Sequence, residues 1–150
     1  VLGNILGDRL RLKIREELGD SYSPNAGSST SMTYPGYGRI SASITVDPDE
    51  AKRVAKVVRD LADELARKGT DADELERAVK PILTGLRESE RTNEYWLGAV
   101  LARAQEQPQR LDWARSRYED NEAITIDEID ELANQYLHDK QAFQIISRPE

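Results

Sequence analysis

The side chains that could do chemistry in this sequence occur in a few short segments. Four basic residues stand within seven positions near the start: Arg9, Arg11, Lys13 and Arg15. A run of hydroxyl side chains follows at 28–31, the only histidine is His138, and cysteine is absent. A histidine-based zinc site needs at least two or three ligands, and a serine nucleophile needs a base beside it. The sequence therefore indicates no metal site and no self-contained hydrolytic site in this chain.

Two of these segments allow more than one interpretation. We interpret Ser28 and Ser29 as part of a polar strand face, or of an edge strand that can pair with an extended peptide. Arg9, Arg11 and Lys13 form either a solvated helix face, which is the more common case, or the lining of a cleft that attracts acidic peptides.

The first third of the chain predicts a helix followed by a hairpin. Apolar residues recur at helical spacing over 2–18, and no capping residue precedes them, so we expect the chain to be part of a longer polypeptide. Residues 21–33 have an extended character, and residues 34–37 carry the Pro-Gly signal of a type II turn. Residues 39–46 then alternate strictly between apolar and polar side chains, which completes an antiparallel hairpin.

The rest of the chain predicts several helices and one last strand. Asp47-Pro48 is expected to start a helix that ends at Gly69, and Pro81 predicts a kink in the next helix. Capping boxes are indicated by two pairs: Thr70 with Asp73, and Thr125 with Glu128. Further helical patterns lie around 95–101 and 111–118, and residues 142–147 read as a strand.

This order predicts an α+β fold in a single domain over residues 1–150. The antiparallel sheet consists of the hairpin and the C-terminal strand, and several helices cover one of its faces.

The segment Leu12–Ser23 is the most specific part of the sequence. In it a helix ends with Arg15-Glu16, Gly19 breaks the helix, and Tyr22 opens the next strand seven residues after the arginine. This order resembles a signature in the second half of the pitrilysin/insulinase family of inverted-zincin metallopeptidases. The resemblance covers essentially the whole chain, including the helix opened by residues 93–97, and implies a truncated C-terminal domain of such an enzyme.

The family's zinc site is absent from this sequence. Catalysis in the family rests on an H-x-x-E-H motif with a downstream glutamate, and the sequence contains no such motif. The resemblance therefore implies the half of the enzyme that does not bind metal: no cofactor belongs to this chain, and zinc belongs to the N-terminal half of the parent enzyme. In the family, the two halves face each other across an enclosed chamber.

The resemblance also implies roles for individual residues. It implies that Arg15 contacts the substrate and that the hydroxyl of Tyr22 donates a hydrogen bond near the scissile carbonyl, which stabilises the transition state. Without the resemblance, Arg15 would be a helix-end cation and Tyr22 an aromatic residue on a strand face. Arg11, Ser28 and Ser29 are further candidates for substrate binding.

We therefore predict the substrate-clamping C-terminal domain of a zinc-dependent endopeptidase, inactive as an isolated chain. One alternative is a non-catalytic scaffold or peptide-binding homologue with the same fold. The other is an independent α+β binding module unrelated to proteolysis. An H-x-x-E-H motif in upstream sequence would distinguish the first function from the others.

Charge and composition limit the partners. A net charge of −7 argues against nucleic acid as a partner, and no apolar run is long enough to span a membrane. The absence of cysteine leaves the compartment open between periplasm and cytoplasm, and we slightly favour the periplasm. The expected partners are a peptide or protein substrate, the N-terminal metal-binding half of the same enzyme and, through open strand edges, a second copy of the chain.

Overall fold

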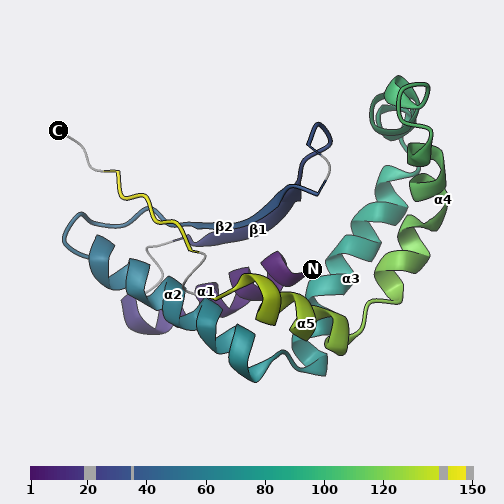
Figure 1. Ribbon diagram of the computed structural model, residues 1–150. Helices are drawn as coiled ribbons and strands as arrows, with labels where there is room; N and C mark the ends of the chain where they lie inside the picture. Colours follow the sequence, from purple (N-terminus) through teal and green to yellow (C-terminus); the bar gives the residue numbers. More distant parts are fainter. Residues whose placement is uncertain (19–22, 35, 139–141, 148–150) are drawn as a thin grey trace.

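The computed structural model describes residues 1–18, 23–34, 36–138 and 142–147. In chain order its elements are α1 (Leu2–Leu18), β1 (Asn25–Thr30), β2 (Gly38–Ser43), α2 (Ala51–Lys68), α3 (Ala72–Ser89), the π-helix η1 (Tyr95–Val100), the 3-10 helix η2 (Leu101–Arg103), α4 (Gln109–Glu122) and α5 (Ile126–Tyr136). The hairpin β1–β2 lies over α1, α2 and α5, whereas α3 leads out of this body and forms a projecting arm with α4 (Figure 1). The predicted α+β class, with helices on one face of an antiparallel sheet, is confirmed.

Helix α1 forms the centre of the core, as its apolar spacing predicts. The buried side chains on this helix are Leu2, Ile5, Leu6, Leu10 and Ile14. Most of them pack against apolar side chains of α2, α3 and α5. Beside this apolar face, Gly3 approaches β1 so closely that a Cβ at this position would lie 2.6 Å from the carbonyl carbon of Gly27. The missing side chain therefore allows the helix and strand backbones to touch.

The hairpin forms where the alternating pattern predicts it. β1 pairs with β2 in an antiparallel register that places Ala26 opposite Ala42 and Ser28 opposite Ile40. Ala26, Ile40 and Ala42 pack against the helical core. The second strand ends at Ser43, three residues earlier than expected.

The described residues of the hairpin turn agree with the predicted type II turn. The N–H of Tyr37 donates to the carbonyl of Tyr34 at 3.1 Å, and Gly36 has a positive φ of 77°, as the third residue of a type II turn requires. Pro35 lies outside the described residues.

The predicted start of α2 is wrong by a few residues. Asp47-Pro48 does not cap the helix, because residues 48–50 form a turn in which the N–H of Glu50 donates to the carbonyl of Asp47 at 2.9 Å. The helix begins only at Ala51. Its predicted end at Gly69 is confirmed, with a φ of 73° at that residue.

The predicted capping box before α3 is shifted by one residue. Asp71, not Thr70, has the extended backbone of an N-cap, and its side chain accepts a hydrogen bond from the N–H of Glu74. The carboxylate of Glu74 in turn accepts from the N–H of Asp71. The box predicted at Thr125 and Glu128 is confirmed at the start of α5.

The arm follows the predicted order of helices but not their types. Pro81 lies inside one continuous helix α3, whose buried residues Ala78 and Leu86 flank it on both sides. The next segment is a π-helix, in which Tyr95 and Val100, five residues apart, are both buried. Five-residue spacing matches the i→i+5 pattern of that helix type.

The closing strand predicted at 142–147 does not form. These residues have no regular secondary structure, and the sheet of the described chain consists of β1 and β2. Phe143 and Ile145 are largely exposed, and Arg59 of α2 donates a hydrogen bond to the side chain of Gln144. The segment is therefore attached to a helix instead of a sheet edge.

Candidate functional site

Arg11 and Arg15 lie on the exposed face of α1, opposite its buried stripe. They are four residues apart, so their side chains project from the same face of the helix. Both residues are exposed, and Arg15 is the basic residue of the last helical turn. Arg11 donates to the carboxylate of Asp8 at 2.7 Å. This face lies at the end of α1 that precedes residues 19–22.

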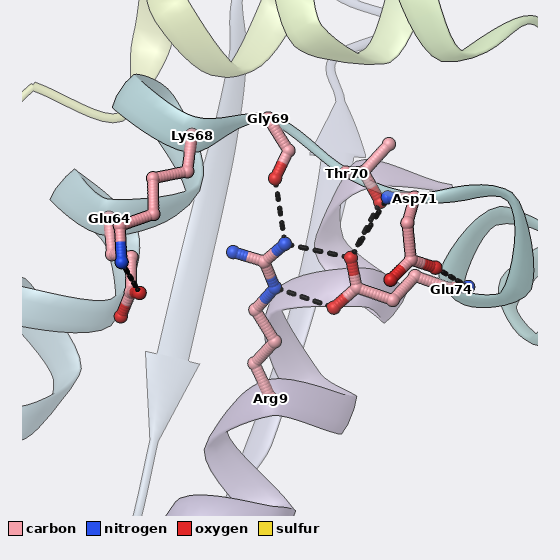
Figure 2. A pocket seen from close by; sticks show the side chains of 7 residues that line it. All are labelled: Arg9, Glu64, Lys68, Gly69, Thr70, Asp71 and Glu74. Atoms are coloured by element: carbon pink, nitrogen blue, oxygen red, sulfur yellow. Dashed lines mark hydrogen bonds and ion pairs between the residues drawn. The ribbon is translucent and has the colours of Figure 1, made fainter.

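Arg9 does not lie on a solvated face. Its Nε and Nη2 donate to the two carboxylate oxygens of Glu74, each at 2.7 Å, and Nη2 also donates to the carbonyl of Gly69 at 2.7 Å. Figure 2 shows the guanidinium between these two acceptors, with Lys68 and Glu64 paired to one side. The solvated interpretation is wrong here because the side chains of Arg9 and Glu74 are only 18% and 16% exposed.

The pKa directions agree with this pairing. The hydrogen bond to Glu74 raises the pKa of Arg9 above its ordinary value, against a smaller opposite effect of burial. The hydrogen bond from Arg9 lowers the pKa of Glu74, and bonds from the N–H of Asp71 and the hydroxyl of Thr70 lower it further. Both groups are therefore held in their charged forms.

Helix α5 is connected to the same group of residues between α2 and α3. The N–H of Thr70 donates to the carboxylate of Asp130 at 2.8 Å, and a Cβ at Gly69 would lie 2.3 Å from the same carboxylate. We name the set Arg9, Gly69, Thr70, Glu74 and Asp130 the junction cluster. It joins α1, the α2–α3 connection, α3 and α5, so it positions the helix that carries Arg11 and Arg15.

Ser28 and Ser29 lie at the other end of α1. Ser28 is beside Gly3, since a Cβ on that glycine would stand 2.6 Å from the Ser28 nitrogen. Twelve residues separate Gly3 from Arg15, which is about 18 Å along a helix. Successive strand residues point to opposite faces, so Ser28 shares the helix-facing side with Ile40, whereas Ser29 shares the outer face with Arg39. The structure therefore does not bring the two serines together with the arginines.

Tyr22 and Gly19, which carry the most specific part of the predicted signature, lie outside the described residues. The geometry of Tyr22 relative to Arg15 stays a prediction.

The described residues offer no group of three or more His, Cys, Asp or Glu side chains placed to hold a metal ion. His138 is exposed just beyond α5, far along the chain from Ser28 and Ser29. The donor set of the described residues does not fit a zinc site. Among the helices of the described chain, none is long and apolar enough to cross a membrane.

The family profile described as Peptidase M16 inactive domain matches residues 1–82. The chain belongs to this family. The match includes α1, the hairpin, α2 and the first half of α3, and the predicted resemblance to the C-terminal domain of an insulinase-family peptidase is confirmed. The description of this family names it as the inactive domain.

A solved structure extends the likeness in fold to almost the whole chain. The crystal structure of the periplasmic protease PqqL from Escherichia coli aligns over 91% of this chain with a TM-score of 0.71 and 18% sequence identity. The chain spans 15% of the length of that protein. Among curated proteins, none matches this chain.

Sequence reasoning missed the junction cluster. The pairing of Arg9 with Glu74 joins residues 65 positions apart, and no local spacing signals such a contact. The correct capping box at Asp71 and Glu74 was the available sign, because it places the Glu74 carboxylate at a helix start close to the core.

Proposed function

We propose that this chain is the substrate-binding domain of a zinc-dependent endopeptidase, which contributes Arg15 and Tyr22 to the active-site chamber. The observation that carries the proposal is membership of the inactive-domain family combined with the exposed position of Arg15 in the last turn of α1. Since the donor set of the described residues does not fit a zinc site, we assign the metal to the N-terminal half of the parent enzyme.

Arg15 acts in this proposal by binding substrate. An exposed guanidinium offers a planar set of N–H donors suited to carboxylate or main-chain carbonyl oxygens. The connection of α1 to α3 and α5 through the junction cluster fixes the helix, so that the guanidinium meets the peptide without reorganising the domain. Arg11, on the same helix face, adds positive charge near the same peptide.

Tyr22 acts in this proposal on the scissile carbonyl. Its hydroxyl donates a hydrogen bond to the oxygen that becomes negatively charged as the tetrahedral intermediate forms. A single donor of this kind contributes roughly 2–4 kcal/mol to transition-state stabilisation.

Ser28 and Ser29 have a separate place in the proposal. They lie in β1, whose outer edge pairs with no strand of the described chain, and an extended peptide can add to such an edge through main-chain hydrogen bonds. Because the serines are about 18 Å along α1 from Arg15, they would contact a different part of the same substrate.

Reconstitution tests the proposed function. The chain is mixed with a separately produced N-terminal metal-binding half, and cleavage of a fluorogenic peptide is followed for each half and for the mixture. We expect cleavage only in the mixture, and a raised KM when the chain carries Arg15→Ala. A mixture that stays inactive although the halves associate would favour the scaffold alternative.

The compartment is also a proposal. The similar structure is described as a periplasmic protease, and we propose the same compartment for the parent enzyme. Fractionation of cells into periplasm and cytoplasm, followed by immunodetection, tests this: recovery in the cytoplasm alone would refute it.

A further inference from the structure

Helix α3 belongs to two separately packed parts of the molecule. Its first turns join the main core, where Ala78 is buried and Leu75 is half-buried. Farther along the helix Leu86 is buried too, but no apolar side chain of residues 79–122 belongs to that core cluster or packs against it. Within the described chain, no side-chain hydrogen bond or ion pair joins residues 79–122 to the remainder. The projecting part is therefore held to the body mainly through its two chain connections.

The projecting residues 86–122, which we call the arm, are linked to one another by their own contacts. The guanidinium of Arg87 in α3 lies over the ring of Tyr118 in α4, 4.6 Å from its centroid. Arg110 of α4 donates a hydrogen bond to the carbonyl of Ala99 in η1 at 2.7 Å. Because these contacts join α4 to both α3 and η1, the arm forms one unit.

Three features weaken α3 between the body and the arm. Pro81 lies inside the helix and has no N–H to donate to the carbonyl of Arg77, so one helical hydrogen bond is missing. The hydroxyl of Thr84 donates to the carbonyl of Lys80 at 3.0 Å, a contact that often bends helices. Gly85 has open space where a side chain would be, and glycine lowers the stability of a helix interior. Bends in helices occur at such positions.

The second connection of the arm lies at the same level as this weak stretch. Helix α3 leads away from the body and α4 returns beside it (Figure 1), with Arg87 over Tyr118. Pro81 precedes Arg87 by six residues, and Ile124 follows Tyr118 by six, between α4 and α5. Six residues of helix span about 9 Å, so both connections lie about equally far from the Arg87–Tyr118 contact, on the side of the body. The chain therefore enters and leaves the arm at one level, as a hinge requires.

We propose that residues 81–85 of α3 and the connection at 123–124 form a hinge, on which the arm turns as a rigid unit relative to the body. Helix α4 has 14 residues, so the arm is about 21 Å long. A turn of about 20° at the hinge moves the far end of such an arm by about 7 Å. The end that moves carries the exposed apolar side chains Trp96, Leu97 and Leu101.

This motion is independent of the proposed function. Arg11 and Arg15 belong to α1, whose buried side chains lie in the body, so both keep their positions when the arm turns. The hinge therefore stands or falls separately from the roles proposed for Arg15 and Tyr22.

Distances between spin labels on the whole chain, measured by double electron–electron resonance, test the hinge. Because the sequence has no cysteine, labels attach only at introduced positions. Four exposed residues are replaced in pairs: Lys52→Cys and Glu131→Cys in the body, Gln105→Cys and Glu119→Cys in the arm. At least one of the two pairs that join Gln105 to the body should give distances spread over about 7 Å. The pair within the body and the pair within the arm should each give one narrow distribution.

Variants then locate the motion. Pro81→Ala combined with Gly85→Ala restores the missing N–H and stiffens the helix, so the distances between body and arm should collapse to one narrow distribution. Gly98→Ala is a matched change at a glycine with equally open surroundings beyond the hinge, and it should leave the spread unchanged.

Several results would overturn the proposal. One is a narrow distribution between body and arm in the wild type. Another is a spread that persists in the Pro81→Ala, Gly85→Ala variant or that Gly98→Ala narrows equally, because the motion would then arise elsewhere. A spread within the arm as wide as that between arm and body would show that the arm is not rigid.

Discussion

Replacing Arg9 with methionine should destabilise the fold far more than the same change two residues later at Arg11. Methionine keeps an unbranched side chain as far as the position of Nε but removes all three hydrogen bonds that Arg9 makes to Glu74 and Gly69. Arg11 instead makes an ion pair with Asp8 within one helix, and its side chain is 51% exposed. The two substitutions therefore compare a junction between helices with a solvated local pair.

The expected loss of stability follows from how exposed the side chains of Arg9 and Glu74 are. Breaking a fully buried ion pair costs about 3–5 kcal/mol, and an exposed pair contributes at most about 1 kcal/mol. With 18% and 16% of the two side chains exposed, Arg9 and Glu74 lie nearer the buried case. Glu74 keeps the hydroxyl of Thr70 and the N–H of Asp71 as donors in the variant. We therefore expect a loss of about 2 kcal/mol for Arg9→Met, equivalent to a fall in Tm of about 4–8 °C, and less than about 0.5 kcal/mol for Arg11→Met.

The pairing of Arg9 with Glu74 also predicts that the stability of the fold depends on pH. The pKa of Glu74 is lowered in the folded protein, mainly by the hydrogen bond from Arg9. Its contribution to stability is therefore complete above the unfolded pKa of about 4.3 and is lost as pH falls from there through the folded value. Glu74→Gln retains the capping geometry without the charge, so it should remove this part of the acid sensitivity.

Urea denaturation followed by circular dichroism measures these effects. Stabilities of the wild type, Arg9→Met, Glu74→Gln and the double variant form a cycle at pH 7, with Arg11→Met as the control. Repeating the wild type and Glu74→Gln between pH 5 and pH 3 tests the acid dependence. Equal losses for Arg9→Met and Arg11→Met, or additive losses in the cycle, would refute the claim that Arg9 and Glu74 act as a pair.

Three further predictions concern packing, chemistry and association. Gly3→Ala places a Cβ 2.6 Å from the backbone of Gly27, so it should lower the free energy of unfolding by about 1–3 kcal/mol. Gly85→Ala has open space around it and should raise the free energy of unfolding by about 0.5–1 kcal/mol. Urea denaturation of both variants checks this, and equal effects of the two substitutions would contradict it. The isolated chain should retain no stoichiometric zinc after dialysis and cleave no fluorogenic peptide, because its donor set lacks an H-x-x-E-H motif; one tightly held zinc per chain, or cleavage that a chelator stops, would disprove this. The outer edges of β1 and β2, which pair with no other strand of the described residues, should promote self-association. Sedimentation that shows only monomer at high concentration would count against this.

Local signals predict most of the elements of this fold correctly. Helix α1, the hairpin, the end of α2 at Gly69 and the capping box at Thr125 all depend on spacing or turn chemistry within a few residues. The start of α2 was predicted wrongly because Asp47-Pro48 also suits a turn, and here the turn formed by residues 48–50 competes successfully with the helix.

The errors in prediction arise where distant contacts decide the structure. Alternating Phe143 and Ile145 indicate a strand, but a strand also needs a partner edge, which the local pattern does not supply. Arg9 resembles Arg11 in sequence, yet only Arg9 lies opposite Glu74 when α1 packs against α3.

In the candidate site, too, local sequence predicts some features whereas distant contacts decide others. Exposure of Arg11 and Arg15 follows from their positions opposite the buried stripe of α1, and the resemblance predicted from the sequence rests on the segment that contains Arg15. The distance of Ser28 and Ser29 from the arginines follows instead from the direction in which α1 crosses β1 at Gly3 and Gly27.

The most direct test of the central claim is the steady-state kinetics of Tyr22→Phe in the parent enzyme. This substitution keeps the ring and removes the hydroxyl donor, so a contact made only in the transition state would be lost without affecting substrate binding. We predict a fall in kcat of roughly 10²–10³ with little change in KM or Tm. Wild-type turnover by Tyr22→Phe, with any defect appearing only as a lowered Tm, would contradict the account and leave Tyr22 with a structural role.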